Sequence, residues 1–538
     1  MIRTLRARAV PSLLGLALLV PAAVASPAAA AAADFPAGYL GYHTYAEMVA
    51  DIDAVVGAHP GIARKVSIGT TYKGRTMWAV KISDNVGLDE AEPEVLFDGL
   101  THADEHMGLE MTLKIIHWLV NGYGVDGRIT KIVDTREVWV IPAVNPDGAE
   151  YDISGGKFHF WRKNRQPTPG TTAVGTDLNR NFGYRWGGGG RTSKNPFAIT
   201  YRGPSAFSAP ETRNIRDFLA SRVVGGRQQI RTAITFHEAG RLVMWPYGYT
   251  YANVPVDMTS SDHDALVIIG KHMAATNGYK PEQASDLYVT SGTTRDYEYG
   301  KYRIFAYTFE MSVVDYPDDA LIPAETGRNK AAVLYLIERA GCPLAVLGTA
   351  TRVARCGAFD DDLEVLRGWT INADGTDTAT AGRFQIGNPA ATSNSTGMKQ
   401  LGVVTSGRHA LITGTAAGSW AGANDVDGGR TSATSPAIIL PATAGQKLQF
   451  RWTFADDSSA VIGDELRAEI LDVGAATATA VLVVHGTSTV RNASWHLASI
   501  DLSAYAGRTI RIRFSATDAG SNSLVEAGVD DVRVTQPQ

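Results

Sequence analysis

The chain has 538 residues, of which 44% are hydrophobic and 20% are charged. This length exceeds one ordinary domain and predicts two, or at most three, with the composition of a soluble, globular protein. The formal net charge of −5 argues against nucleic acid or an anionic membrane surface as a partner.

The first 33 residues have the pattern of a secretory signal. Three arginines within the first eight residues precede the apolar run 13–24, and an alanine-rich stretch follows to Ala33. We therefore expect residues 1–33 to be removed and the mature protein to be secreted and extracellular. Because three arginines and no acids are lost, the formal charge moves from −5 to −8. The apolar run is too short to span a membrane and no second long run follows, so no membrane span is expected. The alternative is a disordered, alanine-rich tail.

Between residues 34 and 345, strand-like and helix-like patterns alternate. Short runs rich in valine, isoleucine and phenylalanine, typical of buried strands, occur at 94–97, 138–143, 232–236 and 304–309. Between the first two, Met107, Met111, Ile115 and Trp118 share one helix face. Strands that alternate with helices predict an α/β domain in which a mixed, mostly parallel sheet is sandwiched by helices.

The composition changes after Cys356. Residues 358–538 are rich in threonine, serine, glycine and alanine, and short strands are expected at 437–440, 447–454, 466–471, 480–484 and 509–514. We predict an all-β sandwich or jelly-roll accessory domain there, joined to the α/β domain by a linker over 346–357. The two cysteines, Cys342 and Cys356, lie 14 positions apart and are most simply paired as a local disulfide in an exported protein.

Residues that can bind metal or move protons follow three of the expected strands. His102 and Glu105 stand between the strand at 94–97 and the next helix, while His237 and Glu310 each end a strand. Because parallel strands place such residues at one edge of the sheet, the four side chains are expected at one site. Two imidazoles and a carboxylate suit a catalytic zinc ion, and a buried glutamate must pair, bind metal or take up a proton. Taken singly, the first pair could be a solvated helix start and His237 a structural histidine.

Further motifs occur in a fixed order along the chain. They are Asn145–Gly148 (NPDG), Trp161–Lys163 (WRK), Asp177–Asn181 (DLNRN), Trp245–Gly248 (WPYG) and Tyr288, which precedes Glu310 by 22 positions. Together with the metal-binding residues, they resemble the zinc carboxypeptidase family typified by pancreatic carboxypeptidase A, and still more its secreted bacterial members. The resemblance covers roughly residues 34–340 and implies a carboxypeptidase-like fold for them.

The resemblance implies a role for each residue of the metal site. His102, Glu105 and His237 would hold one zinc ion, which activates water and polarises the scissile carbonyl. Glu310 would act as the general base. Arg162 would stabilise the oxyanion that forms during the reaction.

Three further residues are implied to hold the substrate. Asn179 and Arg180 would bind its C-terminal carboxylate by charge-assisted hydrogen bonds, and Tyr288 would close over it. Taken singly, the arginine could solvate a surface loop and the tyrosine could be a core or rim aromatic. Together these residues imply a peptidase that removes C-terminal residues one at a time, whose partners are the C-termini of peptides or proteins. The alternatives are a zinc-dependent peptidoglycan or amino-acid amidase, which does not need the carboxylate contacts, and a non-catalytic binding protein on the same fold.

The chain departs from the family pattern at three points. Asp104 stands between the metal ligands where many members carry an arginine that positions the substrate; it either supports the ligands or is an exposed acid at the start of a helix. Arg295 takes the place at the floor of the pocket for the departing side chain, and it predicts a preference for C-terminal Glu or Asp unless it turns away or is neutralised by Asp296 or Glu298. A catalytic domain that starts near Asp34 leaves no room for an inhibitory pro-domain, so the enzyme would be exported active or controlled elsewhere, with the C-terminal region as a candidate.

The C-terminal region resembles, on composition alone, the accessory domains of secreted bacterial proteases. Cell wall, polysaccharide or the catalytic domain itself are its expected partners. The loop Asn424–Gly429 (NDVDGG) is a candidate Ca²⁺ site because hard oxygen ligands near glycine suit that ion, with Asp530 and Asp531 as further donors. A polar turn with two solvated acids is an equal alternative.

Overall fold

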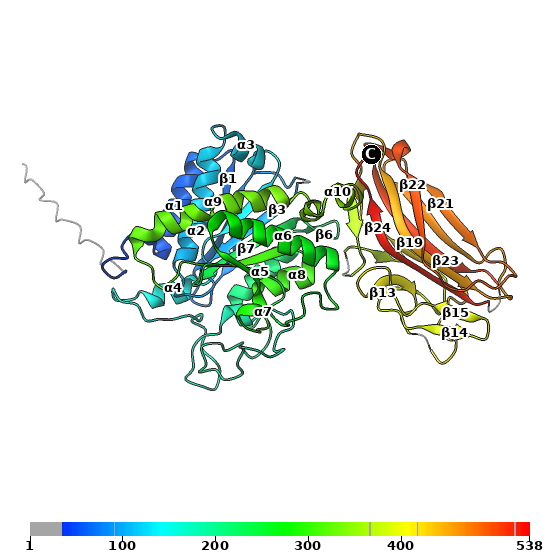
Figure 1. Cartoon of the computed structure of the whole chain (residues 1–538), viewed down its shortest axis with the longest axis horizontal. Helices are drawn as coiled ribbons and strands as arrows, with labels where there is room; N and C mark the ends of the chain where they lie inside the picture. Colours follow the sequence, from blue (N-terminus) through cyan, green and yellow to red (C-terminus); the bar gives the residue numbers. More distant parts are fainter. Residues whose placement is uncertain (1–34, 91, 365–366, 417, 521–522, 538) are drawn as a thin grey trace, which may run out of the picture. The chain divides into compact units, whose positions relative to one another are not determined.

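The computed structural model describes residues 35–90, 92–364, 367–416, 418–520 and 523–537. The predicted secretory signal over 1–33 lies outside these ranges. Residues Asp34–Gln538 form one compact unit, in which mixed helices and strands give way to strands after helix α10 (Thr349–Arg355) (Figure 1). Within the described ranges, no helix has both the length and the apolar character needed to cross a membrane.

A mixed eight-stranded sheet lies at the centre of the α/β part. In spatial order, its strands are β1 (Ala63–Thr70), β2 (Thr76–Ile82), β4 (Glu137–Ile141), β3 (Glu94–Gly99), β7 (Ile230–Glu238), β10 (Phe305–Met311), β8 (Leu242–Trp245) and β9 (Lys280–Gln283). Strands β4, β3, β7 and β10 run parallel to one another, and β8 runs parallel to β9. The pairs β1–β2, β2–β4 and β8–β10 are antiparallel. The predicted mixed, mostly parallel sheet is confirmed.

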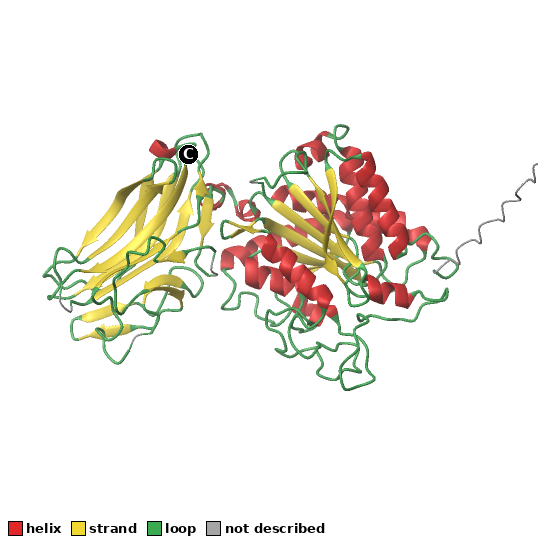
Figure 2. Ribbon diagram, turned by 180° about the vertical axis from the view of Figure 1, so that it is seen from behind, coloured by secondary structure: helices red, strands yellow, loops and turns green. Residues whose placement is uncertain are grey.

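Helices cover both faces of this sheet (Figure 2). One core includes α1 (Tyr45–Ala58), α2 (Met107–Gly122), α3 (Gly127–Val133), α4 (Pro146–Asp152), α6 (Ser260–Asn277) and α9 (Ile322–Arg339). The other core includes α5 (Pro210–Ser221) and α8 (Thr294–Tyr302). Strand β3 shows how one segment serves both: Val95 and Phe97 pack in the first core and Leu96 in the second, because successive strand residues point to opposite faces. A strand covered on both sides is therefore mostly apolar.

Helix α2 carries the residues that follow the predicted metal ligands. Met107, Met111 and Ile115 are fully buried, and Trp118 packs partly buried against the same core, which confirms the expected helix face. The helix begins one residue after His106, so the loop between β3 and α2 is short and fixed at both ends. This places the loop at the C-terminal edge of the central strands.

The C-terminal part is an all-antiparallel sandwich of two sheets. One contains β13 (Phe384–Gly387), β16 (Ala410–Thr413), β24 (Val525–Val534), β19 (Lys447–Asp456) and β22 (His496–Asp501), with β11 (Phe359–Asp361) paired to β24. The other contains β12 (Thr370–Ile371), β17 (Gly429–Thr434), β23 (Thr509–Asp518), β20 (Glu465–Asp472) and β21 (Thr477–His485), with β18 (Ile438–Ile439) paired to β23. In β20, every second residue is buried, as expected for one face on a core. The predicted β-sandwich is confirmed.

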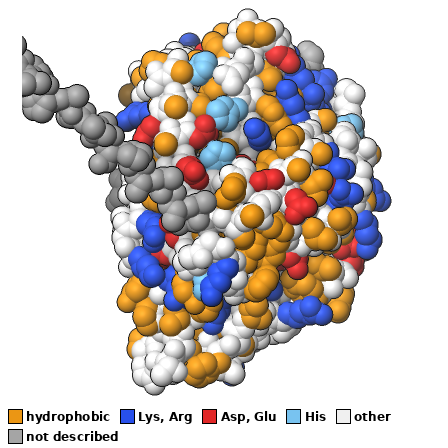
Figure 3. Space-filling view, turned by 90° about the vertical axis from the view of Figure 1, so that its left-hand side faces the viewer, with side chains coloured by type: hydrophobic (Ala, Val, Ile, Leu, Met, Phe, Trp, Pro, Cys, Tyr) orange, Lys and Arg blue, Asp and Glu red, His pale blue; other side chains and the backbone are white. Residues whose placement is uncertain are grey.

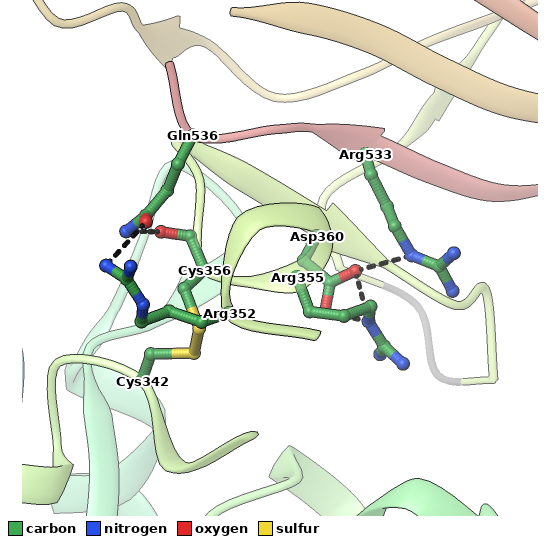
Figure 4. The surroundings of a disulfide bond; sticks show 7 residues. All are labelled: Cys342, Arg352, Arg355, Cys356, Asp360, Arg533 and Gln536. Atoms are coloured by element: carbon green, nitrogen blue, oxygen red, sulfur yellow. Dashed lines mark hydrogen bonds and ion pairs between the residues drawn. A yellow bond between two sulfur atoms is a disulfide. The ribbon is translucent and has the colours of Figure 1, made fainter. Parts of the chain in front are cut away.

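The segment predicted as a linker is ordered by a disulfide and by polar contacts. Cys342 and Cys356 are bonded, as their spacing predicts. Gln536, which follows β24, donates to the Cys356 carbonyl at 3.0 Å, and both Arg355 and Arg533 donate to the Asp360 carboxylate (Figure 4). These contacts hold α10 against the first and last strands of the sandwich.

Candidate functional site

Three side chains converge at the C-terminal edge of the central sheet. His102 Nδ1 lies 2.7 Å from Glu105 Oε1, and His237 Nδ1 lies 2.7 Å from Glu105 Oε2 and 3.0 Å from His102 Nδ1. Each of the three residues is at most 5% exposed. Of the potential ligand trios in the described ranges, this is the only one that contains histidine. Two imidazole nitrogens and a carboxylate that face a common point are the donors that catalytic zinc takes while one position stays open, so the residues fit a zinc ion.

The local fold holds these ligands in place before any ion binds. The Asn145 side chain caps helix α4 by accepting from Gly148 N, and it donates to the Thr101 carbonyl at 3.3 Å. The Ala103 amide donates to the Arg162 carbonyl at 3.0 Å. His237 belongs to β7 and stands in register beside Glu310 of β10. The NPDG and WRK motifs therefore brace the ligand loop through hydrogen bonds.

Asp177 joins His102 to Arg162. Its Oδ1 lies 3.2 Å from His102 Nε2, and its Oδ2 accepts from Arg162 Nε at 3.1 Å. Burial alone would raise the pKa of this carboxyl, but the charges of Arg162 and Arg180 hold it well below its usual range. A carboxylate on the outer nitrogen of a ligating histidine fixes its tautomer and ring orientation. On the other ligand, Asn179 Nδ2 lies 3.4 Å from His237 Nε2.

Burial and neighbouring charges shift the pKa values of His237, Glu105 and Glu310. Burial lowers the pKa of His237 to about 4, so its imidazole is neutral, as a metal ligand must be. Burial raises the pKa of Glu105, but the two imidazoles outweigh it and lower the value below its ordinary range. Burial, followed by the charge of Glu105, raises the pKa of Glu310 to about 8. Glu310 is thus a partly exposed carboxyl with an affinity for a proton near neutral pH.

Arg162 lies beside Glu105, one of the three residues that would hold zinc. Its Nη1 is 3.3 Å from Glu105 Oε1, while its Nε is held by Asp177. Burial would lower the pKa of the guanidinium, but the charges of Asp177 and Glu105 raise it above its usual value. A permanent cation, oriented by two carboxylates, therefore stands next to the place where a carbonyl oxygen would approach the metal.

A second positively charged region, the cationic corner, is made by Arg180 and Arg191 next to Asn179. Arg180 is 2% exposed and donates from Nε to the Arg191 carbonyl and from Nη1 to the Asn179 carbonyl, both at 2.8 Å. The Tyr288 ring centroid lies 5.9 Å from the Arg180 guanidinium and 4.6 Å from that of Arg191. Two guanidinium groups under one tyrosine suit a carboxylate. Sequence reasoning did not single out Arg191, because nothing in the sequence indicates that this residue lies next to Tyr288 in the fold.

Arg295 is buried next to acids that the sequence alone only partly indicated. The residue is 4% exposed, and its guanidinium donates to Thr308 Oγ1 at 2.8 Å and lies 3.4 Å from Asp296 Oδ1. A Cβ at Gly248 would lie 2.8 Å from its Nη2, so the glycine leaves room for the guanidinium. Glu298 is completely buried, and neither of its carboxylate oxygens has a hydrogen-bond partner among the described residues. Burial and then the charge of Asp98 raise the pKa of Glu298 well above its usual range.

Asp104 does not contact the metal ligands through its side chain in the described structure. It is half-buried, its Oδ1 has no partner there, and burial raises its pKa to about 6. Glu238, which follows His237, accepts from the Met107 amide at 3.1 Å through one oxygen, and its other oxygen lacks a partner in the same ranges. Sequence reasoning missed Glu238; its place directly after a ligand at a strand end was the available signal.

The candidate Ca²⁺ loop does not gather a set of ligands in the described part of the chain. Among the described residues, no trio of potential ligands within 4.8 Å of one another includes a residue of this loop, Asp530 or Asp531. The Asp425 carboxylate accepts from the Val525 amide at 3.1 Å. Asp530 and Asp531 accept hydrogen bonds from Thr405. Calcium binding at this loop stays a prediction.

The comparisons with known proteins agree with this geometry. The zinc carboxypeptidase family matches residues 48–331. A zinc carboxypeptidase from Saccharothrix mutabilis subsp. capreolus is 44% identical over 320 residues, which cover 59% of this chain and 73% of that protein. Carboxypeptidase A2 from Mus musculus is 32% identical over 277 residues, 51% of this chain and 63% of the mouse protein. The crystal structure of carboxypeptidase A from Helicoverpa armigera matches with a TM-score of 0.50 and 27% identity, covering 56% of this chain and 74% of that one.

The matched region contains His102, Glu105, His237 and every residue that the motifs imply for substrate binding. A match over more than half of the chain, a 44% identical relative and a preformed two-histidine, one-glutamate group all point the same way. The chain belongs to the zinc carboxypeptidase family and is a peptide hydrolase whose catalytic ion is zinc.

Proposed function

We propose that this protein is a secreted carboxypeptidase that removes single residues from the C-termini of peptides, with a preference for acidic C-terminal residues. The observation that carries the proposal is the cationic corner of Arg180 and Asn179 beside His237. Asn179 contacts a metal ligand directly. A carboxylate held there is thus fixed at a short distance from the reacting carbonyl, which is what restricts cleavage to the last peptide bond.

Substrate binding follows from the buried charges. Arg180 is held from two sides by backbone carbonyls, so its remaining donor atoms are oriented before substrate arrives. Tyr288 stands over the same corner and would cover the bound carboxylate. The amidase alternative has no use for this corner, because an amide or sugar-linked substrate brings no terminal carboxylate.

The chemistry is divided among a few side chains. Zinc, when bound by His102, Glu105 and His237, supplies a Lewis acid that activates water and polarises the carbonyl. Glu310 takes a proton from the attacking water and delivers it to the nitrogen of the leaving residue as the C–N bond breaks. Arg162 donates hydrogen bonds to the carbonyl oxygen as it gains negative charge.

Arg295 supports the preference for acidic residues. Its guanidinium lies in the segment after Tyr288, with its Nε unpartnered among the described residues. Asp296 is shared between Arg295 and two backbone groups, because its carboxylate also accepts from the Gly248 amide at 2.9 Å and the Tyr249 amide at 3.2 Å. A carboxylate from the substrate can therefore pair with Arg295.

Secretion rests on the first 33 residues of the sequence. The disulfide between Cys342 and Cys356 supports it, since such bonds persist in oxidising compartments. N-terminal sequencing of the protein recovered from culture medium should begin near residue 34. Protein found only in the cytosol with an intact first segment would contradict this part.

The exopeptidase activity is tested with a peptide library that has random C-terminal residues, analysed by mass spectrometry over time. The proposal predicts ladders that shorten by one residue from the C-terminus and stop when a chelator is added. Internal fragments, or cleavage that persists in chelator, would contradict it.

The specificity is tested with Arg295→Ile, using Arg295→Lys as a matched variant that keeps the charge. We expect the isoleucine variant to lose activity on C-terminal Glu and to gain on C-terminal Phe, while the lysine variant keeps the wild-type order. An unchanged Glu-to-Phe ranking in the isoleucine variant would refute the role of Arg295.

A further inference from the structure

A cavity of about 370 Å³ lies at the end of the central sheet that is far from the metal ligands. Ile230 and Arg231, the first two residues of β7, line it, whereas His237 stands near the other end of the same strand. Arg231 and His237 are six positions apart, which corresponds to about 20 Å along a strand. The cavity is therefore separate from the candidate active site.

The walls of this cavity combine apolar and charged side chains. Ile230, Phe305, Leu344 and Phe359 line it, and each of them is at most 6% exposed. Six basic side chains and four acidic ones also line it, so basic groups are in excess. A volume of this size, with apolar walls and a few charged groups, is typical of sites for small organic molecules.

One wall is held in place by contacts between two segments that are distant in the sequence. Arg227 in β6 (Arg227–Gln228) donates from Nη1 to the Ala358 carbonyl at 2.7 Å. The backbones of Gly226 and Gly368 also approach closely, since a Cβ at Gly226 would lie 2.2 Å from the Gly368 Cα. The cavity is thus bordered by a built wall and not only by surface side chains.

The four acids of the cavity each have a donor or a cation close by. These contacts are Arg355 with Asp360 at 2.8 Å, Trp369 with Asp361 at 3.0 Å, Arg367 with Asp362 at 3.5 Å and Tyr299 with Asp262 at 2.8 Å. The acids are therefore already engaged, and the positive charges that they do not balance are open to another partner.

Arg231 is the cation that lacks such a partner. It is partly buried, and its side chain makes no hydrogen bond or ion pair with any residue that the structure describes. Burial, followed by the charges of Arg227 and Arg367, lowers the pKa of Arg231 to about 10, so the guanidinium keeps its charge at neutral pH. On the outer face in Figure 3, lysine and arginine side chains stand at the surface, where water solvates them. A partly desolvated, unpaired guanidinium instead favours an anion beside it.

We propose that this cavity binds a small organic acid, with its carboxylate on Arg231 and its apolar body against Ile230, Phe305 and Leu344. The apolar body follows from the volume, because a bare inorganic anion would leave these apolar walls uncovered. Such a ligand would bind the folded chain alone and would stabilise it in proportion to its concentration. The inference does not depend on the proposed peptidase activity, since the two sites lie at opposite ends of β7.

Calorimetric titration of the zinc-loaded protein with 3-phenylpropionate tests the proposal. Because a carboxylate can also enter the active site, the titration uses Arg180→Gln, which lacks the residue that would hold a carboxylate there. We expect this protein to bind the acid about tenfold or more tightly than its neutral analogue 3-phenylpropanamide, and about tenfold or more tightly than acetate, which lacks the apolar body. No binding of the acid, or equal binding of the amide, overturns the proposal. Equal binding of acetate or of inorganic phosphate overturns the assignment to an organic acid.

Variants of Arg231 assign the binding to the cavity. In the Arg180→Gln protein, Arg231→Gln should weaken binding of the acid by about tenfold or more, whereas Arg231→Lys, which keeps the charge, should weaken it by a smaller factor. Arg128→Gln is the control, because that side chain on α3 is 44% exposed and already paired with Glu338; it should leave the affinity unchanged. Acid binding that survives Arg231→Gln within twofold overturns the proposal.

Two further measurements guard against a misfolded variant. Arg231→Gln alone should keep kcat/KM on a peptide substrate within about twofold of wild type, because it lies about 20 Å along β7 from the metal ligands. In the wild type, a crystal structure with 3-(4-bromophenyl)propionate locates the ligand by the anomalous scattering of bromine. We expect a bromine peak against Ile230 and Leu344; a peak in the active site alone overturns the proposal.

Discussion

Replacing Asp177 by asparagine tests whether one buried carboxylate aligns the metal site with the rest of the catalytic residues. The carboxylate contacts His102 Nε2 at 3.2 Å and Arg162 Nε at 3.1 Å, and it accepts from the Asn179 amide at 3.0 Å. An asparagine side chain at this position would keep the size and one acceptor oxygen but lose the charge. The change therefore removes an electrostatic constraint while it leaves the packing intact.

The expected effect has two parts. Loss of the partner of a ligating histidine weakens metal binding by about 10- to 100-fold, or about 1.4–2.7 kcal/mol. In addition, Arg162 loses the negative charge of Asp177, its closer carboxylate partner, and keeps only the 3.3 Å contact with Glu105. A misplaced oxyanion donor costs about 100- to 1,000-fold in kcat, so activity should stay low even when zinc is saturating.

The assay measures zinc affinity by competition with a chromogenic chelator and kcat/KM with zinc in excess. Asp152→Asn is a matched control, because Asp152 is also fully buried and lies 3.1 Å from a histidine, His106, that is not a metal ligand. We expect the control to keep wild-type zinc affinity. The reasoning is refuted if Asp177→Asn binds zinc within twofold of wild type, or if both variants lose affinity equally.

Three other changes have defined outcomes. Glu310→Gln should lower kcat by about 100-fold or more with the zinc content unchanged, because Glu310 is not a ligand; loss of zinc in atomic absorption measurements would contradict this. Burial raises the pKa of Asp425 to about 7, so the folded state binds a proton that the unfolded state releases above about pH 4, and stability should fall between about pH 4 and 7 by on the order of 2–4 kcal/mol. Asp425→Asn should flatten this part of the pH–Tm curve and raise Tm above pH 7. If the variant instead has a lower Tm, and added Ca²⁺ raises the Tm of the wild type, a bound cation is indicated. Replacing Cys342 and Cys356 together by alanine opens a loop of 14 positions, which should cost about 3 kcal/mol of unfolding free energy; chemical denaturation that finds no change would show that the contacts around α10 suffice.

The sequence predicted the central sheet because its strands are buried on both faces. Runs such as 94–97 and 232–236 are typical of buried strands, and the structure makes them parts of β3 and β7. The strands of the accessory domain were harder to predict from the sequence. Strands β19 and β23 were expected, and the run expected at 437–440 covers β18, but β12, with two residues, was not expected. A strand as short as β12 exists only through pairing with its neighbour and leaves no periodicity to detect.

The metal group was predictable because its members stand at strand ends in a known order. Arg191, Glu238 and Asp98 were not, and Glu298 was named only as an acid that could neutralise Arg295, because their importance comes from contacts between distant segments. Glu298 lies on α8, where helical spacing gives no sign that it would be completely buried next to Arg295. Tertiary contacts of this kind need the folded chain.

The most direct test of the whole account compares hydrolysis of a blocked dipeptide with a free C-terminal carboxylate against the same dipeptide as its C-terminal amide. The zinc-loaded protein should cleave the free acid at least about 100-fold faster, and removal of zinc by a chelator should abolish the activity until zinc is restored. Equal rates on the acid and the amide would contradict the central claim that Arg180 and Asn179 select a terminal carboxylate beside the metal site.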